Sequence, residues 1–186
     1  MKIIKFRNTD NPEKLEIDVI PDSAIQKSGK PFFMPFTNER YECRIAAAVR
    51  IGRLGKNIAS RFASRYYNEW GLCLSIRATE MLERLKAAGE PWAEATAFDG
   101  AIIEGIFYDD NLSGKEIVYS GSDGLQRLTM PLNEMFDSLI AQASRHFIFK
   151  MGDLVLIDLG DSHLLKLDTK VTATIDNKES INIKIK

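Results

Sequence analysis

The segment Tyr41–Ile51 reads YECRIAAAVRI, and its alternation decides what kind of fold the chain can adopt. Apolar side chains at 41, 43, 45, 47, 49 and 51 would share one face, while Glu42, Arg44 and Arg50 would lie on the other. Because successive side chains of a strand point to opposite faces, this pattern predicts a long strand with one apolar face.

The rest of the chain is predominantly strand-like. Strands are predicted at 3–6, 15–20, 70–76, 101–108, 116–119, 154–158, 171–175 and 181–185. Helices are predicted at 58–66, 78–88 and 132–143, where apolar residues recur every three to four positions. A loop is expected at 7–13, and turns at 21–25, 28–31 and 160–163. Strands outnumber helices without alternating with them, which favours an α+β fold rich in antiparallel strands, in one domain over 1–186.

Composition excludes several classes of protein. Of 186 residues, 45% are apolar, so a packed core is expected. The 25 basic and 26 acidic residues nearly balance, which argues against a nucleic-acid-binding face and against a polybasic membrane anchor. No apolar run approaches the roughly 20 residues of a spanning helix. Cys43 and Cys73 lie in apolar strand-like runs and are predicted to be buried thiols, so the expected location is the cytoplasm.

Five segments in register resemble the fumarylacetoacetate hydrolase superfamily. They are PDSAI at 21–25 with GKPFFMP at 29–35, YECRIA at 41–46 with IGRLGKNI at 51–58, RYY at 65–67 with GL at 71–72, PW at 91–92 with AFDG at 97–100, and SR at 144–145 with KMGDLV at 150–155. The resemblance implies a strand-rich fold, a mixed β-roll or sandwich with a few peripheral helices. It also implies Mg²⁺ or Mn²⁺ chemistry on 2-oxo-acid-like or acylpyruvate-like substrates.

The resemblance implies a metal site that this chain matches at one position only. Family members hold the metal with three carboxylates, two of them in a Tyr-Glu-x-Glu strand. Glu42 fits the first glutamate, Arg44 stands at the second, and Ser75 falls at the third ligand, an aspartate in the family. Thr96 occupies the position of a family lysine. An N-terminal histidine–glutamate pair is also expected, and only Glu13 offers a remnant.

Electrostatics then argues against a metal at this position. The family site presents a charge near −3, whereas Glu42 with Arg44 presents about zero. A guanidinium about 4 Å from a divalent ion would cost roughly 8 kcal/mol at an effective dielectric constant near 20. We therefore expect no bound metal and name no catalytic residue. The candidate ligand-binding residues are Glu42, Arg44, Ser75 and Thr96.

Each singled-out residue has a plainer interpretation beside the functional one. Glu42 and Arg44 are predicted to form a structural ion pair, or Arg44 holds a ligand carboxylate or phosphate in place of the metal. His146 is expected at a helix end or on the surface, and His163 in a turn where Ser162 is not its catalytic partner. Trp92 is expected to pack beneath the altered site.

Two functional hypotheses follow. The first is a catalytically degenerate relative that binds a small carboxylate, or that pairs with an active relative in a hetero-oligomer. The resemblance also implies a homodimer. The alternative is a hydrolase, isomerase or decarboxylase for 2-oxo acids or acylpyruvates with a rebuilt, metal-free site. No nucleic-acid partner and no membrane is expected in either case.

Overall fold

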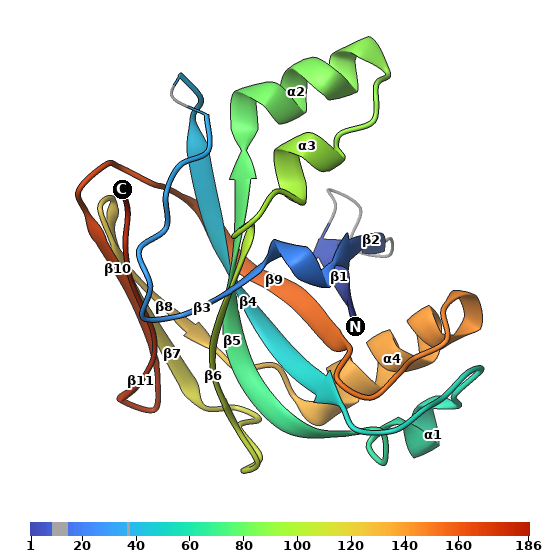
Figure 1. Ribbon diagram of the computed structural model, residues 1–186. Coiled ribbons are helices and arrows are strands. Elements are labelled where there is room, and N and C mark those ends of the chain that lie inside the picture. The colour runs from blue at the N-terminus through green and yellow to red at the C-terminus, as the bar shows by residue number, and fades with distance from the viewer. Residues whose placement is uncertain (9–14, 37) are drawn as a thin grey trace.

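The computed structural model describes residues 1–8, 15–36 and 38–186, and it is dominated by strands (Figure 1). The strands are β1 (Lys2–Asn8), β2 (Leu15–Pro21), β3 (Ile25–Lys27), β4 (Tyr41–Ile51), β5 (Tyr67–Ala78), β6 (Ile102–Tyr108), β7 (Glu116–Gly121), β8 (Gly124–Thr129), β9 (Leu154–Leu164), β10 (Lys170–Ile175) and β11 (Lys178–Lys184). The helices are η1 (Asp22–Ala24), a single 3-10 turn, and α1 (Ser60–Ala63), α2 (Thr79–Ala88), α3 (Ala93–Thr96) and α4 (Asn133–His146).

The strands form two sheets. The larger has seven strands in the order β2-β1-β9-β4-β5-β6-β3, and the smaller has four in the order β11-β10-β7-β8. In the larger sheet β4 pairs antiparallel with both β5 and β9, whereas β1 pairs parallel with β9. Helices α2 and α3 lie at one end of the molecule and α1 and α4 at the other (Figure 1). This is the strand-rich α+β architecture that the sequence predicts.

The main hydrophobic core lies between the two sheets. It joins the odd-numbered side chains of β4, such as Tyr41 and Ile45, to Tyr119 of β7 and Ile183 of β11. A second cluster covers part of the opposite face of the larger sheet, and it consists of Ile3, Ile20, Ala24, Ala46, Ala48, Cys73, Ala101, Ile102, Leu154 and Leu156. The even-numbered face of β4 is therefore apolar at its centre and polar toward Glu42.

Several predicted elements are confirmed and others need correction. Strand β4 has the bounds that its alternation predicts, and α2 begins one residue later than predicted. The predicted helix at 58–66 is wrong in extent, because only α1 is helical. The chain must return to pair with β4, and Gly52 N donates to Tyr66 O at 2.7 Å as the hairpin closes. Strands β3 and β8 and helix α3 were not predicted.

Strand β9 is longer than the sequence predicts, and the turn expected at 160–163 is instead part of it. Gly160 has a φ of 58°, a left-handed conformation that glycine adopts without steric cost. The register between β4 and β9 shifts between Cys43 and Ile45, which marks an irregularity in this pairing. Pairing resumes beyond it, and Ser162 and His163 consequently lie on a strand of the larger sheet.

Two further expectations concern the N-terminal loop and membrane spans. The loop prediction at 7–13 is wrong for Arg7 and Asn8, which belong to β1, and residues 9–13, including Glu13, lie outside the described residues. Among the helices of the described residues, none is long and apolar enough to cross a membrane.

Candidate functional site

The candidate site lies on the polar part of one face of the larger sheet, where three strands bring charged side chains together. Glu42 of β4 is opposite Arg77 of β5, and Arg44 is opposite Ser75. Cross-strand neighbours share a face of the sheet, so these four side chains lie on the same side. The predicted grouping of Glu42, Arg44 and Ser75 on one face is therefore what the register produces.

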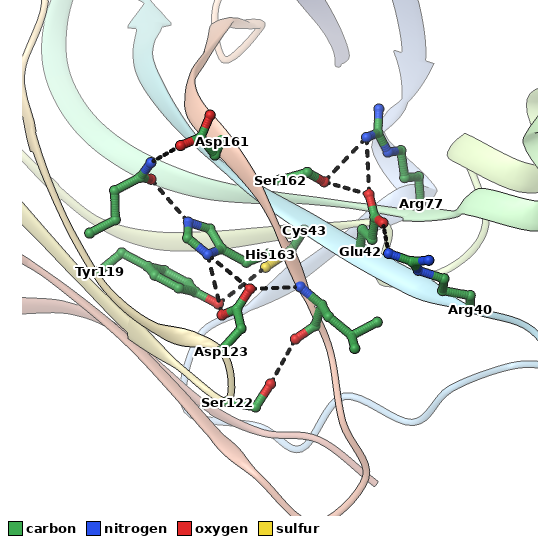
Figure 2. A network of polar contacts seen from close by, with 12 residues as sticks. Arg40, Glu42, Cys43, Arg77, Tyr119, Ser122, Asp123, Asp161, Ser162 and His163 are labelled. Atoms are coloured by element: carbon green, nitrogen blue, oxygen red, sulfur yellow. Dashed lines mark hydrogen bonds and ion pairs between the residues drawn. The ribbon is translucent and has the colours of Figure 1, made fainter.

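Glu42 is held by three donors, none of which is Arg44 (Figure 2). Its Oε2 accepts from Ser162 Oγ at 2.7 Å and from Arg77 Nη2 at 3.2 Å. Its Oε1 lies 2.9 Å from Arg40 Nη2. The predicted Glu42–Arg44 ion pair is therefore wrong. The strand register places Arg77 directly across from Glu42, whereas Arg44 is two residues away along the same strand.

These contacts set the protonation state of Glu42. Burial alone would raise the pKa of its carboxyl group, but the hydrogen bonds from Ser162 and Arg77, with the charges of Arg77 and Arg40, outweigh burial and lower it. A carboxylate with a depressed folded-state pKa adds stability above its unfolded-state pKa. That contribution is lost as the pH falls through the folded-state pKa.

Removing the Ser162 hydroxyl tests this arrangement. We expect Ser162→Ala to lower the free energy of unfolding by about 1 kcal/mol at pH 7, because the ionised Glu42 loses a hydrogen bond. The difference should shrink as the pH falls through the lowered pKa of Glu42, because the carboxyl group is then protonated in the folded state as well as in the unfolded state. Urea unfolding at pH 7 and pH 3 measures it, with Ser113→Ala, in the loop between β6 and β7, as control. A loss of equal size at both pH values would contradict the role assigned to Ser162.

A buried lysine approaches the position where the resemblance implies a metal ligand. The ammonium group of Lys5 donates to Ser75 Oγ and lies 3.0 Å from Asp158 Oδ2. Lys5 and Asp158 are only 7% and 4% exposed. Because β1 pairs with β9 and β9 with β4, Lys5 reaches across two strands to contact Ser75 of β5. The cation at this position is therefore supplied by the chain itself.

The charged side chains surround a narrow inner pocket. It is lined by Lys5, Arg7, Asp18, Ile20, Ser75, Ile76, Arg77, Leu82 and Thr96. Arg7 is fixed by ion pairs to Asp18, with 2.8 Å between Nε and Oδ2, and to Glu16, with 3.1 Å between Nη2 and Oε2. The free volume is about 10 Å³, enough for one water-sized group. Three of the lining side chains are cationic and one is anionic, which suits an anionic oxygen.

An outer pocket of about 320 Å³ adjoins the inner one and shares Asp18, Ile20 and Thr96 with it. It lies between β2 and α3, and its other lining residues are Val19, Pro91, Trp92, Ala93 and Ala97. Trp92 is 40% exposed at this pocket. The expectation that Trp92 packs beneath the site is therefore wrong, because the indole forms part of an open wall.

The four candidate residues thus divide between two settings. Ser75 and Thr96 line the inner pocket. Glu42 does not line it but accepts a hydrogen bond from Arg77, which does. Arg44 is the cross-strand neighbour of Ser75 and does not line the pocket either. The Nε atom of Arg44 is buried and has no hydrogen-bond partner among the described residues. A buried donor of this kind is costly to leave unsatisfied.

A second polar network lies on the other side of β4 and includes His163 (Figure 2). Nδ1 of His163 is 3.2 Å from both carboxylate oxygens of Asp123, and its ring stacks on Tyr119 with 4.0 Å between centroids. Because Ser162 points to Glu42 on the opposite face, it makes no pair with His163. His146 is exposed at the end of α4, as expected.

The two cysteines are free and buried, which confirms their predicted state. Burial raises the pKa of the Cys43 thiol to about 12, so it is protonated at neutral pH. Its Sγ lies 3.7 Å from the Tyr119 hydroxyl. The thiols are therefore packing groups and supply no nucleophile.

Sequence reasoning missed four charged residues of the site: Lys5, Arg7, Arg77 and Asp158. Two of them carried a usable signal, because Lys5 interrupts the apolar run 3–6 and Asp158 the run 154–159. A charge inside a buried strand is costly unless it is paired, so each predicts a partner elsewhere. Nothing local indicates that the two are partners.

A divalent metal does not fit the residues present. Among the described residues, no group of three or more His, Cys, Asp or Glu side chains could hold a metal ion. Glu42 is already engaged by two arginines, and the ammonium of Lys5 lies against Ser75. Hard divalent cations require several free oxygen ligands, which this arrangement does not supply.

The chain is similar to known oxaloacetate tautomerases. It is 24% identical over 183 residues to the oxaloacetate tautomerase YcgM of Escherichia coli. The aligned region covers 94% of this chain and 84% of that protein. It is 23% identical over 173 residues to a mitochondrial oxaloacetate tautomerase of Mus musculus, which covers 89% and 78% of the two chains. No model of a protein family matches the chain.

Solved structures share the fold over its full length. The fumarylpyruvate hydrolase of Pseudomonas aeruginosa, solved with Mn²⁺ and pyruvate, matches with a TM-score of 0.88 at 17% identity, covering 100% of this chain and 89% of that one. A fumarylacetoacetate hydrolase family protein of Yersinia pestis matches with a TM-score of 0.86 at 20% identity, covering 100% and 92%. In sequence over most of both chains and in fold, the chain is similar to members of the fumarylacetoacetate hydrolase superfamily.

Proposed function

We propose that this protein binds a small carboxylate without a divalent metal and is catalytically degenerate relative to the metal-dependent members of its superfamily. The observation that carries the proposal is the contact of Lys5 with Ser75 and Asp158. It places a fixed positive charge beside the position of a family metal ligand. An ammonium ion can neutralise a ligand carboxylate there, but it lacks the open coordination sites through which a metal polarises a substrate oxygen.

The cations around the inner pocket support recognition of a carboxylate. Arg77 is 27% exposed in its side chain, and its Nε is buried without a hydrogen-bond partner among the described residues. Its anchor on Glu42 fixes the guanidinium, so little conformational entropy is lost when it binds a ligand. Arg7 is held in the same way by Asp18. Planar guanidinium groups bind carboxylates through paired, charge-assisted hydrogen bonds.

Calorimetry with pyruvate, in excess chelator, tests the proposal. We expect saturable binding to the unmodified protein, and a loss of about tenfold or more in Arg77→Met, because a hydrogen bond to a charged group is removed. Arg84→Met, on the exposed side of α2, is the matched control and should bind as the unmodified protein does. Absence of saturable heat in the unmodified protein, or equal affinity of both variants, would rule the proposal out.

One observation favours a second candidate function, a rebuilt metal-free enzyme. Oδ1 of Asp158 is buried without a hydrogen-bond partner among the described residues, beside the ammonium of Lys5. Such a carboxylate–ammonium pair could exchange a proton with an enolisable 2-oxo acid. Interconversion of the keto and enol forms of oxaloacetate in chelator, abolished in Asp158→Asn, would support this alternative over simple binding.

Pairing with another chain is also proposed. Large apolar side chains are exposed around α1 and α4, namely Leu54, Phe62, Leu132, Met135, Ile148 and Met151. Exposed apolar surface of this kind is common at subunit interfaces, which supports a homodimer or a hetero-oligomer with an active relative. A single-chain mass in light scattering would contradict the homodimer. The buried free thiols support the proposed cytoplasmic location.

A further inference from the structure

The outer pocket carries an inference about the ligand beyond its carboxylate. Its walls are mostly apolar, because Val19 and Ile20 of β2 face Pro91, Trp92, Ala93 and Ala97 across it. Among the described residues, Asp18 is the one charged residue that lines it, and Asp18 is already paired with Arg7. The pocket therefore offers a ligand apolar contact rather than a second site for charge.

The two pockets differ in size as well as in polarity. The inner one admits a single water-sized group, whereas the outer one has about 320 Å³ of free volume. Asp18, Ile20 and Thr96 line both pockets, so the outer pocket adjoins the inner one and offers room for the remaining atoms of a ligand whose anionic oxygen enters the inner pocket. That volume exceeds what pyruvate alone would fill, and it lies within the range of small-molecule pockets.

The aromatic wall of the outer pocket is held in place. Thr96 donates its hydroxyl hydrogen to the carbonyl oxygen of Trp92 at 3.3 Å, which closes the short helix α3. Lys86 of α2 places its ammonium 5.6 Å from the centroid of the Trp92 ring. The indole nevertheless remains 40% exposed, and Val19 of the edge strand β2 is 47% exposed. Both side chains have apolar surface that a ligand could cover.

Resting on the proposed carboxylate binding, we infer that the ligand is a carboxylate with an apolar tail of several carbons, which lies between β2 and Trp92. Small polar dicarboxylates such as oxaloacetate fit this site less well, because their second carboxylate would enter an apolar pocket without a free cation among its lining residues. The apolar tail is what distinguishes the expected ligand from pyruvate.

A series of 2-oxo acids with the same head group tests the inference. Pyruvate, 2-oxobutanoate, 2-oxopentanoate, 2-oxohexanoate and oxaloacetate would each be titrated in chelator and followed by calorimetry and tryptophan fluorescence. We expect affinity to rise about two- to fourfold for each added carbon, as apolar surface is buried, and to be lowest for oxaloacetate. Fluorescence should respond increasingly along the series, because Trp92 contacts the tail while Trp70 is buried in the core.

Two variants separate the tail from the head group. Trp92→Ala should abolish the dependence of affinity on chain length. Phe33→Ala, which removes a 68% exposed aromatic elsewhere, should change neither that dependence nor the affinity for pyruvate. Equal affinity along the series, or a dependence that survives in Trp92→Ala, would overturn the tail inference alone. Failure of every acid to bind would overturn the carboxylate proposal on which it rests.

Discussion

Replacing Lys5 by methionine is expected to lower the free energy of unfolding by about 3–5 kcal/mol, because it leaves the carboxylate of Asp158 buried without its cation. Asp158 is 4% exposed, so water cannot replace the lost partner. The same variant should lose saturable binding of pyruvate, since it removes the positive charge closest to Ser75. Urea unfolding at pH 7 and calorimetry measure the two effects.

A second variant separates a broken ion pair from damage to packing. Adding Asp158→Leu to Lys5→Met removes both charges, and the double variant should recover most of the lost stability, since apolar replacement of a buried pair is often nearly neutral. Lys115→Met removes a lysine from the exposed pair with Asp176 and should cost less than about 1 kcal/mol. Asp158→Leu alone completes the set of variants. If the loss of stability in the double variant equalled the sum of the losses in Lys5→Met and in Asp158→Leu, Lys5 and Asp158 would not be energetically coupled.

Introducing carboxylates at the site is expected to create metal binding. In the triple variant Lys5→Met, Arg44→Glu, Ser75→Asp, the two new carboxylates are cross-strand neighbours, because Arg44 and Ser75 are paired in register. Glu42 lies on the same face two residues along β4. Removing the guanidinium eliminates a repulsion of roughly 8 kcal/mol at 4 Å and an effective dielectric constant near 20.

The expected gain is at least 100-fold in Mn²⁺ affinity, measured by titration calorimetry on folded protein. The control Lys5→Met, Arg44→Gln, Ser75→Asn has the same number of substitutions without new carboxylates, and it should not bind. A triple variant that folds but binds Mn²⁺ no better than this control would show that other features of the site exclude the metal.

The secondary structure was predictable from the sequence wherever a local pattern of apolar and polar residues is sufficient to specify a strand or a helix. The alternation of 41–51 specifies β4 to the residue, because β5 pairs with it along its whole length and β9 pairs with most of it. The extension of β9 was not predictable, since Gly160-Asp161-Ser162 has the composition of a turn. These residues stay in the strand because Leu159 and His163, on either side of them, pair with β4 across the register shift.

The candidate site was predictable in position but not in its contacts. The resemblance places Glu42, Arg44 and Ser75 correctly on one face. The partners of Glu42 depend on the β4–β5 register and on Ser162, which is 120 residues away in the chain. Lys5 and Asp158 are brought together by a parallel pairing between distant strands. No local pattern encodes such a contact, so the cation of the site emerged from the structure alone.

Titration of Mn²⁺ into the unmodified protein is the measurement that tests the central claim most directly. The claim is that Lys5, Arg44 and Ser75 have replaced a metal centre by an internal cation. It predicts no saturable binding below about 1 mM at pH 7, and pyruvate affinity that is the same in Mn²⁺ and in chelator. Stoichiometric Mn²⁺ binding at micromolar concentration, lost in Glu42→Gln, would contradict it.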